Sequence, residues 1–358
     1  MALVDIGISH AELVAAGTAA YPPDLQKQLN LAITPDRLTT VHELASLDIE
    51  VGQHFAAAAN RFFELHKIDS ASIVAIGSHG QTLRHYPRPP TPYSWQIGNP
   101  ATIAAITGIT TVADFRSMDV AFGGEGAPLV PPFHNWFFGK AGQERILLNV
   151  GGIANVSVLH GSPSAHFIGY DTGPGNCLMD EWCRLHLEKP FDHAGAWASS
   201  GSVLPALLQA MLRDSYFDES PPKSTGREQF NLKLVERLVA ENGLGKARPE
   251  DIQATLAQLT AESIATEIER SAAELISPVF VCGGGAHNDE LMRRLRQRLP
   301  SRQVETTAAV NLDPDFVEAT AFAWLAQQRT NLLPVTLSTS AAVRTRCLGA
   351  IYEPRSSA

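Results

Sequence analysis

An acidic residue follows an apolar run in the stretch GYDTGPGN, residues 169–176. The preceding residues, HFIGY, predict a short buried strand, and the following residues, NCLMDEWCRLHLEK, have helical spacing. We therefore expect Asp171 on a strand-to-helix turn, where a carboxylate stands beside backbone N–H groups that can hold an anion. The same pattern also fits a capping or turn residue without a chemical role.

Two further glycine-rich segments follow apolar strands in the same half of the chain, NVGGIAN at 149–155 and VCGGGAHN at 281–288. Glycine permits positive φ and lets backbone N–H groups approach a ligand closely. The second segment precedes a helix expected to begin near Asn288, and a helix N-terminus favours a phosphate group. Each turn alone is typical of an ordinary tight turn, but the three together predict a nucleotide site. No Gly-x-x-x-x-Gly-Lys-[Ser/Thr] segment is present, which excludes a P-loop.

The first half of the chain carries polar side chains in loops after predicted strands, in GSHGQT at 77–82 and ADFRSMD at 113–119. Hydrogen-bonding groups of this kind suit a sugar with many hydroxyls, and an arginine suits a carboxylate. An ordinary turn explains the histidine equally well. The candidates are His79, Gln81, Thr82 and Arg116.

One further carboxylate, Glu318, lies on an otherwise apolar helix face in DFVEATAFAWL. A charge on a helix surface explains it without any function, and a role in a site is the alternative. Hydrolase chemistry has little support, because the pair His42-Glu43 is not followed by a second zinc-binding histidine and no Gly-x-Ser-x-Gly segment occurs.

Apolar strand-like runs alternate with helical patterns along the whole chain, which predicts an α/β fold. A length of 358 residues favours two domains, and we expect them at 1–142 and 143–358. The C-terminal segment is a candidate for packing back on the first domain. Both halves begin with a strand meander and continue with alternating helices and strands, as a duplicated unit does. The first half, however, lacks a counterpart of the opening strand and glycine turn in LLNVGGIANVSVL.

Charge and composition narrow the class of protein. The net charge of −9 argues against nucleic acid or an anionic membrane as a partner. The N-terminus lacks the basic region of a signal peptide, and the longest uncharged window, 93–113, is too polar for a convincing membrane span. The four cysteines form no Cys-x-x-Cys pair, so reduced thiols and a cytoplasmic location are expected.

Taken together, the motifs resemble those of the anhydro-N-acetylmuramic acid kinases, of the sugar kinase, Hsp70 and actin superfamily. The resemblance runs in order from about residue 70 to the C-terminus. It rests on IGSHGQT, QIGNPATIA, TGITTVADFRSMDVAFGGEGAPLVPPFH, LNVGGIANVSVL, GYDTGPGN, PKSTGREQFN, DIQATLAQLTAESI, VCGGGAHN and EATAFAWLA.

The resemblance implies an α/β fold with two ribonuclease-H-like (actin-like ATPase) domains around a central cleft. The first would carry the sugar-binding loops and the second the nucleotide-binding turns. It also implies the reaction: water opens the 1,6-anhydro bridge of 1,6-anhydro-N-acetylmuramic acid at C1 while the freed O6 takes the γ-phosphate of ATP. The products are N-acetylmuramic acid 6-phosphate and ADP. Mg²⁺, a homodimer and a place in cell-wall (peptidoglycan) recycling follow from the same resemblance.

The resemblance gives roles to residues at matching positions. Asp171 would be the general base that activates the water. The sugar pocket would be lined by His79, Gln81, Thr82, Arg116 and Glu318. The nucleotide would be lined by Gly151, Gly152, Asn155, Gly173, Gly283, Gly284 and Gly285.

One departure from the family pattern leaves alternatives open. The family begins with a strand and a Met-Ser-Gly-Thr-Ser turn that holds the ATP phosphates, whereas MALVDI corresponds to the strand after that turn. A non-catalytic relative that binds nucleotide or sugar is therefore an alternative to the kinase, and a kinase for another sugar is a second.

Overall fold

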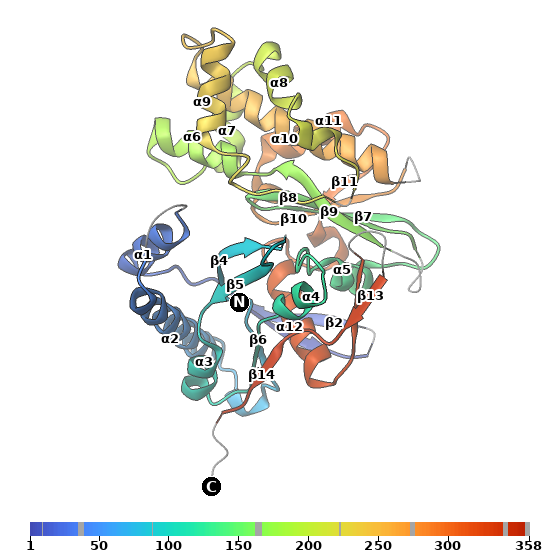
Figure 1. Ribbon diagram of the computed structural model, residues 1–358. Helices are drawn as coiled ribbons and strands as arrows, with labels where there is room; N and C mark the ends of the chain where they lie inside the picture. Colours follow the sequence, from blue (N-terminus) through green and yellow to red (C-terminus); the bar gives the residue numbers. More distant parts are fainter. Residues whose placement is uncertain are drawn as a thin grey trace. The chain divides into compact units, whose positions relative to one another are not determined.

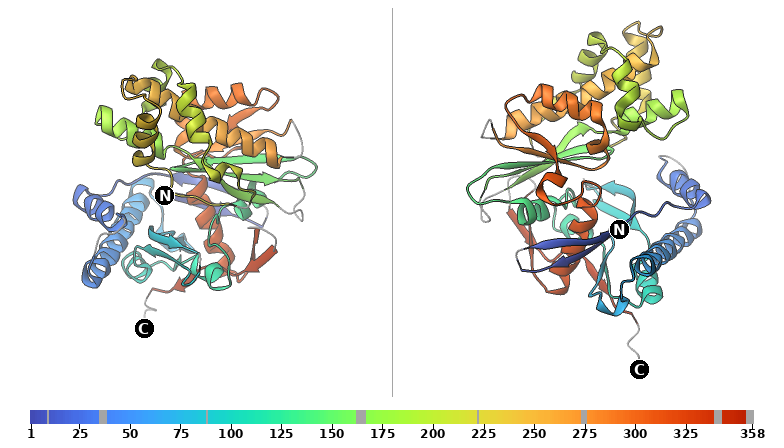
Figure 2. Two further views of the ribbon diagram at one scale, coloured as in Figure 1. Left: turned by 45° about the horizontal axis from the view of Figure 1, so that its top comes forward. Right: turned by 180° about the vertical axis from the view of Figure 1, so that it is seen from behind.

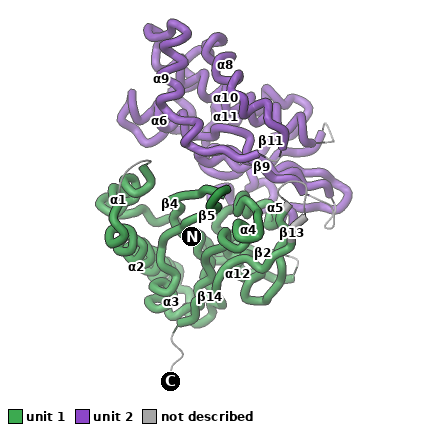
Figure 3. Tube along the Cα trace, in the orientation of Figure 1, with its two compact units in different colours: residues 1–133, 318–358 green, residues 134–317 purple. Residues whose placement is uncertain are grey.

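The chain forms two compact units in the computed structural model, which describes residues 1–8, 10–34, 39–87, 89–161, 167–221, 223–272, 276–338 and 343–354. Unit 1 comprises residues 1–133 and 318–358, and unit 2 comprises residues 134–317 (Figure 3). The sequence predicted domains at 1–142 and 143–358, with the C-terminal segment as a candidate for packing back on the first. In the structure the first stretch of unit 1 ends at Phe133, and the chain returns to unit 1 at Glu318. Its last strand, β14 (Ala350–Tyr352), pairs antiparallel with β6 (Thr111–Ala113).

Unit 2 is built on a five-stranded sheet of order β11-β10-β7-β8-β9. Three consecutive strands form the antiparallel meander β7-β8-β9, and β10 and β11 extend the sheet in parallel from β7. This is the arrangement expected of a ribonuclease-H-like domain. The strands are β7 (Arg145–Val150), β8 (Ile153–Leu159), β9 (Ile168–Pro174), β10 (Val279–Cys282) and β11 (Val304–Thr306).

Helices lie along one side of this sheet (Figure 1). The central one, α10 (Pro249–Ser271), is buried along most of its length and packs against β8 and β9. Alternate residues of the strands, such as Ile146, Val156 and Tyr170, join it in a single apolar core. The other helices are α6 (Cys177–Leu187), α7 (Ala196–Ser200), α8 (Pro205–Leu212), α9 (Leu232–Glu241) and α11 (Asp289–Arg298).

Unit 1 contains smaller sheets, namely the hairpins β1–β2 and β4–β5, the pair β12–β13, and the group β14-β6-β3. Figure 2 shows them from two further directions. The strands not yet given are β1 (Ala2–Ile6), β2 (Ala11–Ala16), β3 (Ile76–Gly77), β4 (Gln81–Tyr86), β5 (Tyr93–Ile97), β12 (Val335–Ser338) and β13 (Val343–Arg346). The helices are α1 (Pro23–Ile33), α2 (Val41–His66), α3 (Pro100–Thr107), α4 (Ser117–Ala121) and α12 (Val317–Thr330), and α5 (Pro131–Phe138) runs across the boundary between the units.

Local sequence signals fix the helix starts that position the unit 1 loops. α2 begins with a capping box, in which Thr40 accepts from the Glu43 N–H and the Glu43 carboxylate accepts from the Thr40 N–H. At α3, the cap Asn99 accepts from the Thr102 N–H at 2.9 Å, with Pro100 in the first turn. Asp48 of α2 accepts from the Asn99 side chain at 2.9 Å and so joins the two helices. Among the described residues, no helix has the length and apolar character needed to span a membrane.

Gly77 tests how closely β3 must approach α12. His79 follows β3 in the chain, and Glu318 lies in α12. A Cβ atom at Gly77 would collide with the backbone carbonyl oxygen of Phe322 on α12. We expect Gly77→Ala to lower the free energy of unfolding by about 1–3 kcal/mol, because backbone must shift to make room. Urea unfolding measures this. The matched control is Gly245→Ala, where a Cβ meets open space, and equal losses in both variants would contradict the packing.

Candidate functional site

Asp171 lies inside strand β9, so the predicted strand-to-helix turn is wrong for this residue. β9 continues to Pro174 because its pairing with β8 continues to Ile153. The register shifts by one residue between Ala154 and Asn155, which leaves Thr172 as the extra residue of a β-bulge. Gly173 and Pro174, which suggested a turn, occupy this bulged strand end, and Gly175 follows it. Bulges of this kind re-aim side chains next to functional sites.

Strand pairing sets Asp171 in a row of polar side chains. Asn149 of β7 is paired with Asn155 of β8, and Asn155 is paired with Asp171 of β9. Directly paired residues project on the same face of a sheet, and their neighbours Val150 and Tyr170 belong to the core on the other face. Two amides and one carboxylate therefore stand side by side on the face opposite the α10 core.

The backbone and carboxylate of Asp171 are held by the segment that precedes α9. The Thr225 N–H donates to Asp171 Oδ2 at 3.1 Å, and the Asp171 N–H donates to the Lys223 carbonyl oxygen at 3.1 Å. The Tyr216 hydroxyl donates to the Asp171 carbonyl oxygen at 2.6 Å. These contacts fix the position of this residue, and the hydrogen bond from Thr225 also orients its carboxylate.

A buried ion pair anchors that segment in turn. Lys223 Nζ donates to Glu267 Oε1 of α10 and to the Tyr216 carbonyl oxygen, both at 3.0 Å. The ammonium also lies 4.6 Å from the centre of the Tyr216 ring. Both charged side chains are buried. No sequence pattern indicated this pair, although Glu267 is a carboxylate in a helix that is buried along most of its length.

The three predicted glycine turns meet at the end of β7. A Cβ atom at Gly175 would collide with the Gly151 carbonyl oxygen, and one at Gly283 would lie 2.9 Å from the Val150 carbonyl oxygen. The N–H groups of Gly175 and Asn176 donate to the carbonyl oxygens of Gly152 and Gly151 at 2.9 and 2.8 Å. Only glycine allows backbones this close.

The remaining predicted glycines differ in their position in the fold and in their exposure to solvent. Gly173 is buried in β9 with a φ of +138°, and Gly283 follows β10 with a φ of +76°. Gly284 and Gly285 lie in the short 3-10 helix η4 (Gly284–His287), the first exposed and the second buried against Val150. This turn separates β10 from α11, whose cap Asn288 accepts from the Leu291 N–H at 3.0 Å.

A cation that the sequence analysis missed lies beside these turns. The exposed side chain of Arg227 places Nη2 3.1 Å from where a Cβ atom on Gly152 would be. Its charge also reaches Cys177 and Asp180 at the start of α6 and lowers the pKa of both groups, although burial raises each pKa overall. A guanidinium over a glycine turn suits a bound anion.

In unit 1, Arg116 organises the predicted polar residues. Its Nε and Nη2 donate to His79 Nε2 at 3.1 and 2.8 Å, and its Nη1 donates to the Gly126 carbonyl oxygen at 2.7 Å. Asp119 accepts from the Gly126 N–H at 2.8 Å. The loop GGEGAP at 123–128 is thereby held at Gly126, by Arg116 at the carbonyl oxygen and by Asp119 at the N–H.

His79 is a neutral hydrogen-bond acceptor. An arginine has no lone pair to offer, so His79 Nε2 must accept and its proton must reside on Nδ1. Burial first and the charge of Arg116 second lower the pKa of His79 to about 3. The ring also lies 4.7 Å from that of Phe322 on α12. Packing and charge together therefore keep His79 uncharged at neutral pH.

The other predicted sugar residues lie on two further elements, α12 and β4. Glu318 stands in the first turn of α12 and is accessible to solvent. Desolvation by the surrounding protein raises the pKa of Glu318, and the charge of Arg116 partly offsets this. Gln81 and Thr82 are neighbours in β4 and so project to opposite faces. At most one of those two side chains can face the Arg116 site directly.

Comparison with known proteins gives a consistent result. The family model described as anhydro-N-acetylmuramic acid kinase matches residues 1–354. The protein of that name from Shewanella frigidimarina is 44% identical over 99% of this chain and 94% of its own length. Its namesake from Pasteurella multocida is 44% identical over 98% of this chain and 92% of its own length.

The solved structures resemble the chain only weakly. The activator of the 2-hydroxyisocaproyl-CoA dehydratase from Clostridium difficile with bound ADPNP has a TM-score of 0.35 and 12% identity. The match covers 65% of this chain and 72% of that one. Likeness at this level supports no conclusion about function.

The neutral state of His79 makes unit 1 sensitive to acid. Its folded pKa of about 3 lies below the usual value of 6.5, so between these values the unfolded chain binds a proton that the folded chain does not. Stability is therefore lost as the pH falls below about 6.5. The slope of the unfolding free energy against pH gives the number of protons taken up on unfolding. We expect His79→Asn to lower this number by about one between pH 6 and pH 4. Urea titrations across this range measure the slope, and identical slopes would show that His79 is charged in the folded protein.

Proposed function

Because the chain belongs to the anhydro-N-acetylmuramic acid kinase family, we propose that it converts 1,6-anhydro-N-acetylmuramic acid, ATP and water to N-acetylmuramic acid 6-phosphate and ADP. The reaction forms a bond from the water oxygen to C1 and breaks the bond from C1 to O6. O6 then bonds to the γ-phosphorus of ATP, which releases ADP. The observation that carries the proposal is the partly exposed polar row ending in Asp171, in a sheet whose end bears three glycine turns.

Unit 2 supplies the nucleotide site in this proposal. Phosphoryl transfer needs positioning and charge neutralisation more than covalent help from the protein. Backbone groups at the glycine turns can approach the phosphates without interference from side chains, and the Arg227 guanidinium adds a positive charge beside Gly152. The lining residues we propose are Gly151, Gly152, Asn155, Gly173, Gly283, Gly284 and Gly285.

Asp171 is the general base. Its carboxylate is oriented by the Thr225 N–H, and the neighbouring Asn155 amide can both donate to and accept from a water molecule. The water gives its proton to Asp171 as its oxygen attacks C1. The Lys223–Glu267 pair contributes indirectly, because it holds the segment that fixes Asp171.

Unit 1 supplies the sugar site. Its hydrogen-bonding groups suit the hydroxyl and amide groups of the sugar, and the Arg116 guanidinium suits the carboxylate of the muramic lactyl group. His79 serves this role by orienting Arg116 through two hydrogen bonds. We propose that the residues in contact with the sugar are drawn from His79, Gln81, Thr82, Arg116 and Glu318.

A magnesium ion accompanies ATP in the proposal. Among the described residues, no group of three or more His, Cys, Asp or Glu side chains is arranged to hold a metal ion. Mg²⁺ bound to a nucleotide is coordinated mainly by phosphate oxygens and water, with one or two oxygen ligands from the protein. The oxygens of Asp171, Asn149 and Asn155 have the required chemistry. When bound, the ion would neutralise charge on the phosphates.

The remaining parts of the proposal follow the family. We place the reaction in the cytoplasm, where ATP is available and where the free cysteines of the chain stay reduced. We also propose a homodimer, and a role in the reuse of amino sugars released from peptidoglycan. The assay that tests the function is ADP release dependent on 1,6-anhydro-N-acetylmuramic acid. Equal rates with N-acetylglucosamine would indicate a different sugar, and no release with any sugar would indicate a binding protein.

The first expected outcome concerns the base. Asp171→Asn keeps the size of the side chain but removes its ability to take a proton, so we expect kcat to fall about 10²–10⁴-fold. Sugar binding, measured by calorimetry, should change little. Asp24→Asn, at an exposed acidic residue in the first turn of α1, is the control and should keep full activity. Near-normal turnover in Asp171→Asn would remove this residue from the mechanism.

The second expected outcome concerns Glu318. Glu318→Gln removes a charge near Arg116 and should raise the KM for the sugar more than the KM for ATP, because the affected contact is with the sugar. Steady-state kinetics with each substrate varied in turn separate the two constants. Glu64→Gln, at an exposed carboxylate of α2, serves as the control. If both KM values stay unchanged, Glu318 is only a surface charge.

A further inference from the structure

Two of the hydrogen bonds that hold Asp171 come from different segments of unit 2. The Thr225 N–H donates to Asp171 Oδ2 at 3.1 Å, and the Tyr216 hydroxyl donates to the Asp171 carbonyl oxygen at 2.6 Å. Tyr216 lies in the short 3-10 helix η3 (Ser215–Asp218), whereas Thr225 lies in the segment that leads to α9. The first bond orients the carboxylate and the second holds the backbone, so both segments must keep the same relative position.

The side chain of Gln229 joins these two segments. The Thr225 hydroxyl donates to Gln229 Oε1, and Gln229 Nε2 donates to Asp214 Oδ1, both at 2.8 Å. Asp214 Oδ1 also accepts from the Tyr216 N–H at 3.0 Å and so caps η3. The hydrogen bonds therefore form a closed ring that begins and ends at Asp171.

The chemistry of the partners fixes the orientation of the Gln229 amide. An ionised carboxylate can only accept hydrogen bonds, so the amide nitrogen must face Asp214 and the amide oxygen must face Thr225. The Thr225 hydroxyl must then donate. A glutamate at position 229 could accept from Thr225 but could not donate to Asp214, and a leucine could do neither. The ring therefore needs an amide at this position.

The backbone around Gln229 is anchored as well. The N–H groups of Gln229 and Phe230 donate to the Gly226 carbonyl oxygen at 3.2 and 3.1 Å and close a tight turn. Phe230 is buried in the core of unit 2, where its ring centre lies 5.7 Å from that of Tyr216. Gln229 is half-buried. Its side chain thus extends from a turn that is fixed by the core.

The position of Thr225 has a direct consequence for the carboxylate of Asp171. A general base must be aligned with the proton that it takes, and a displacement of about 1 Å can cost about 10²-fold in rate. The Thr225 N–H restrains Asp171 Oδ2, so a shift of Thr225 changes the direction of the carboxylate. Arg227, which lies beside Gly152, belongs to the same turn. The turn could therefore serve the base or the nucleotide site, and the two roles differ in their kinetic effects.

We propose that Gln229 is a positioning residue for the base. By joining Thr225 to Asp214, it closes the ring of hydrogen bonds that fixes both the carboxylate and the backbone of Asp171. Gln229 takes no part in the proton transfer itself. The proposal rests on the role of Asp171 as general base in the proposed reaction.

The first test is kinetic. Gln229→Leu keeps the approximate size of the side chain and removes both of its hydrogen bonds. We expect kcat for sugar-dependent ADP release to fall about 10-fold, with the KM for ATP and the KM for the sugar unchanged. In the Asp171→Asn background, the same change should alter the remaining rate less than about twofold, because the carboxylate that it positions is absent. Gln303→Leu, at an exposed glutamine of unit 2, is the matched control and should keep full activity.

A pair of substitutions separates hydrogen bonding from loss of packing. Gln229→Glu places a second carboxylate against Asp214, so kcat should fall at least as far as in Gln229→Leu. Adding Asp214→Asn supplies an amide donor from the opposite side, while its amide oxygen can still accept from the Tyr216 N–H. We expect the double variant to recover most of the lost kcat. Recovery of this kind requires the hydrogen bond between positions 214 and 229.

Hydrogen exchange tests the ring without any substrate. In Gln229→Leu we expect faster exchange of the backbone N–H groups of Thr225 and Tyr216, with unchanged exchange in β7 and β8. Unchanged exchange at Thr225 and Tyr216 would overturn the proposal. If the unmodified chain released no ADP with the sugar, the proposed reaction would be wrong, and the exchange rates would still decide whether Gln229 holds the ring together.

Three kinetic results would also overturn the proposal. An equal fold loss from Gln229→Leu with and without the Asp171 carboxylate would show that Gln229 acts elsewhere. A raised KM for ATP at unchanged kcat would show that the turn serves Arg227. Failure of Asp214→Asn to restore any rate to Gln229→Glu would show that the hydrogen bond between the two positions is not what matters.

Discussion

The polar face of the unit 2 sheet depends on the alternation of side chains along its strands. Because successive residues project to opposite faces, the same strands that bury Val150, Ala154 and Tyr170 against α10 must present Asn149, Asn155 and Asp171 on the other face. A single bulge in β9 sets the register at Asp171. The chemistry of this face is thus a consequence of how the core is packed on the opposite face.

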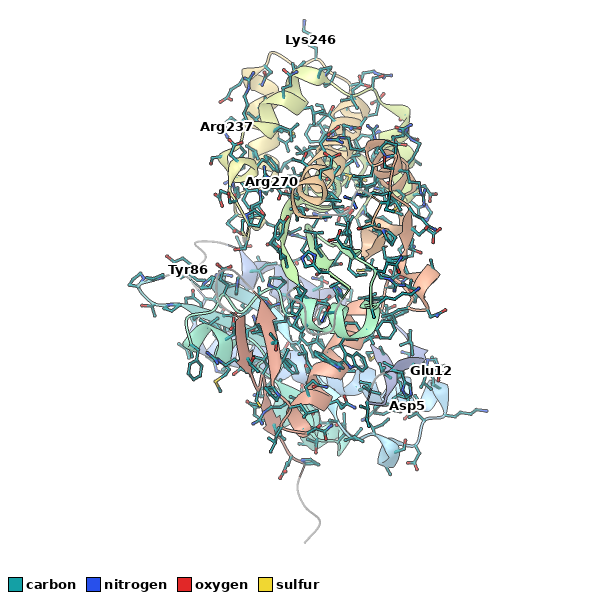
Figure 4. All side chains as sticks on the ribbon, turned by 90° about the vertical axis from the view of Figure 1, so that its right-hand side faces the viewer. Asp5, Glu12, Tyr86, Arg237, Lys246 and Arg270 are labelled. Carbon is teal, nitrogen blue, oxygen red and sulfur yellow. The ribbon has the colours of Figure 1, made fainter. Side chains whose placement is uncertain are left out.

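The charged side chains near the two proposed sites have different kinds of hydrogen-bond partner. In unit 2, the buried Glu267 carboxylate accepts from both Lys223 and Arg270, and the Lys223 carbonyl oxygen accepts from the Asp171 N–H. In unit 1, Arg116 is oriented by a neutral histidine and a backbone carbonyl oxygen, so its positive charge is not cancelled by those partners. Figure 4 shows, by contrast, charged residues at the surface. Among them are Asp5 and Glu12, two exposed acidic residues that lie opposite each other on the neighbouring strands β1 and β2.

Much of this could be predicted from local sequence. The capping box of the helix Val41–His66, the cap at Asn99 and the hairpin of β7 and β8 each agree with local residue spacing and turn chemistry. The position of Asp171 could not be predicted in this way, because glycine and proline mark turns in general but here occupy a bulged strand. The Lys223–Glu267 pair depends on contacts between residues far apart in sequence. No local pattern encodes such contacts.

The central claim is that Asp171 acts on the water that attacks the sugar. The most direct measurement is a crystal structure of the Asp171→Asn variant with 1,6-anhydro-N-acetylmuramic acid and a non-hydrolysable ATP analogue bound. The account predicts an ordered water molecule within about 3.2 Å of the side chain at position 171, placed opposite the bond from C1 to O6. A sugar whose C1 lies far from this side chain, with the water held by another residue, would contradict it.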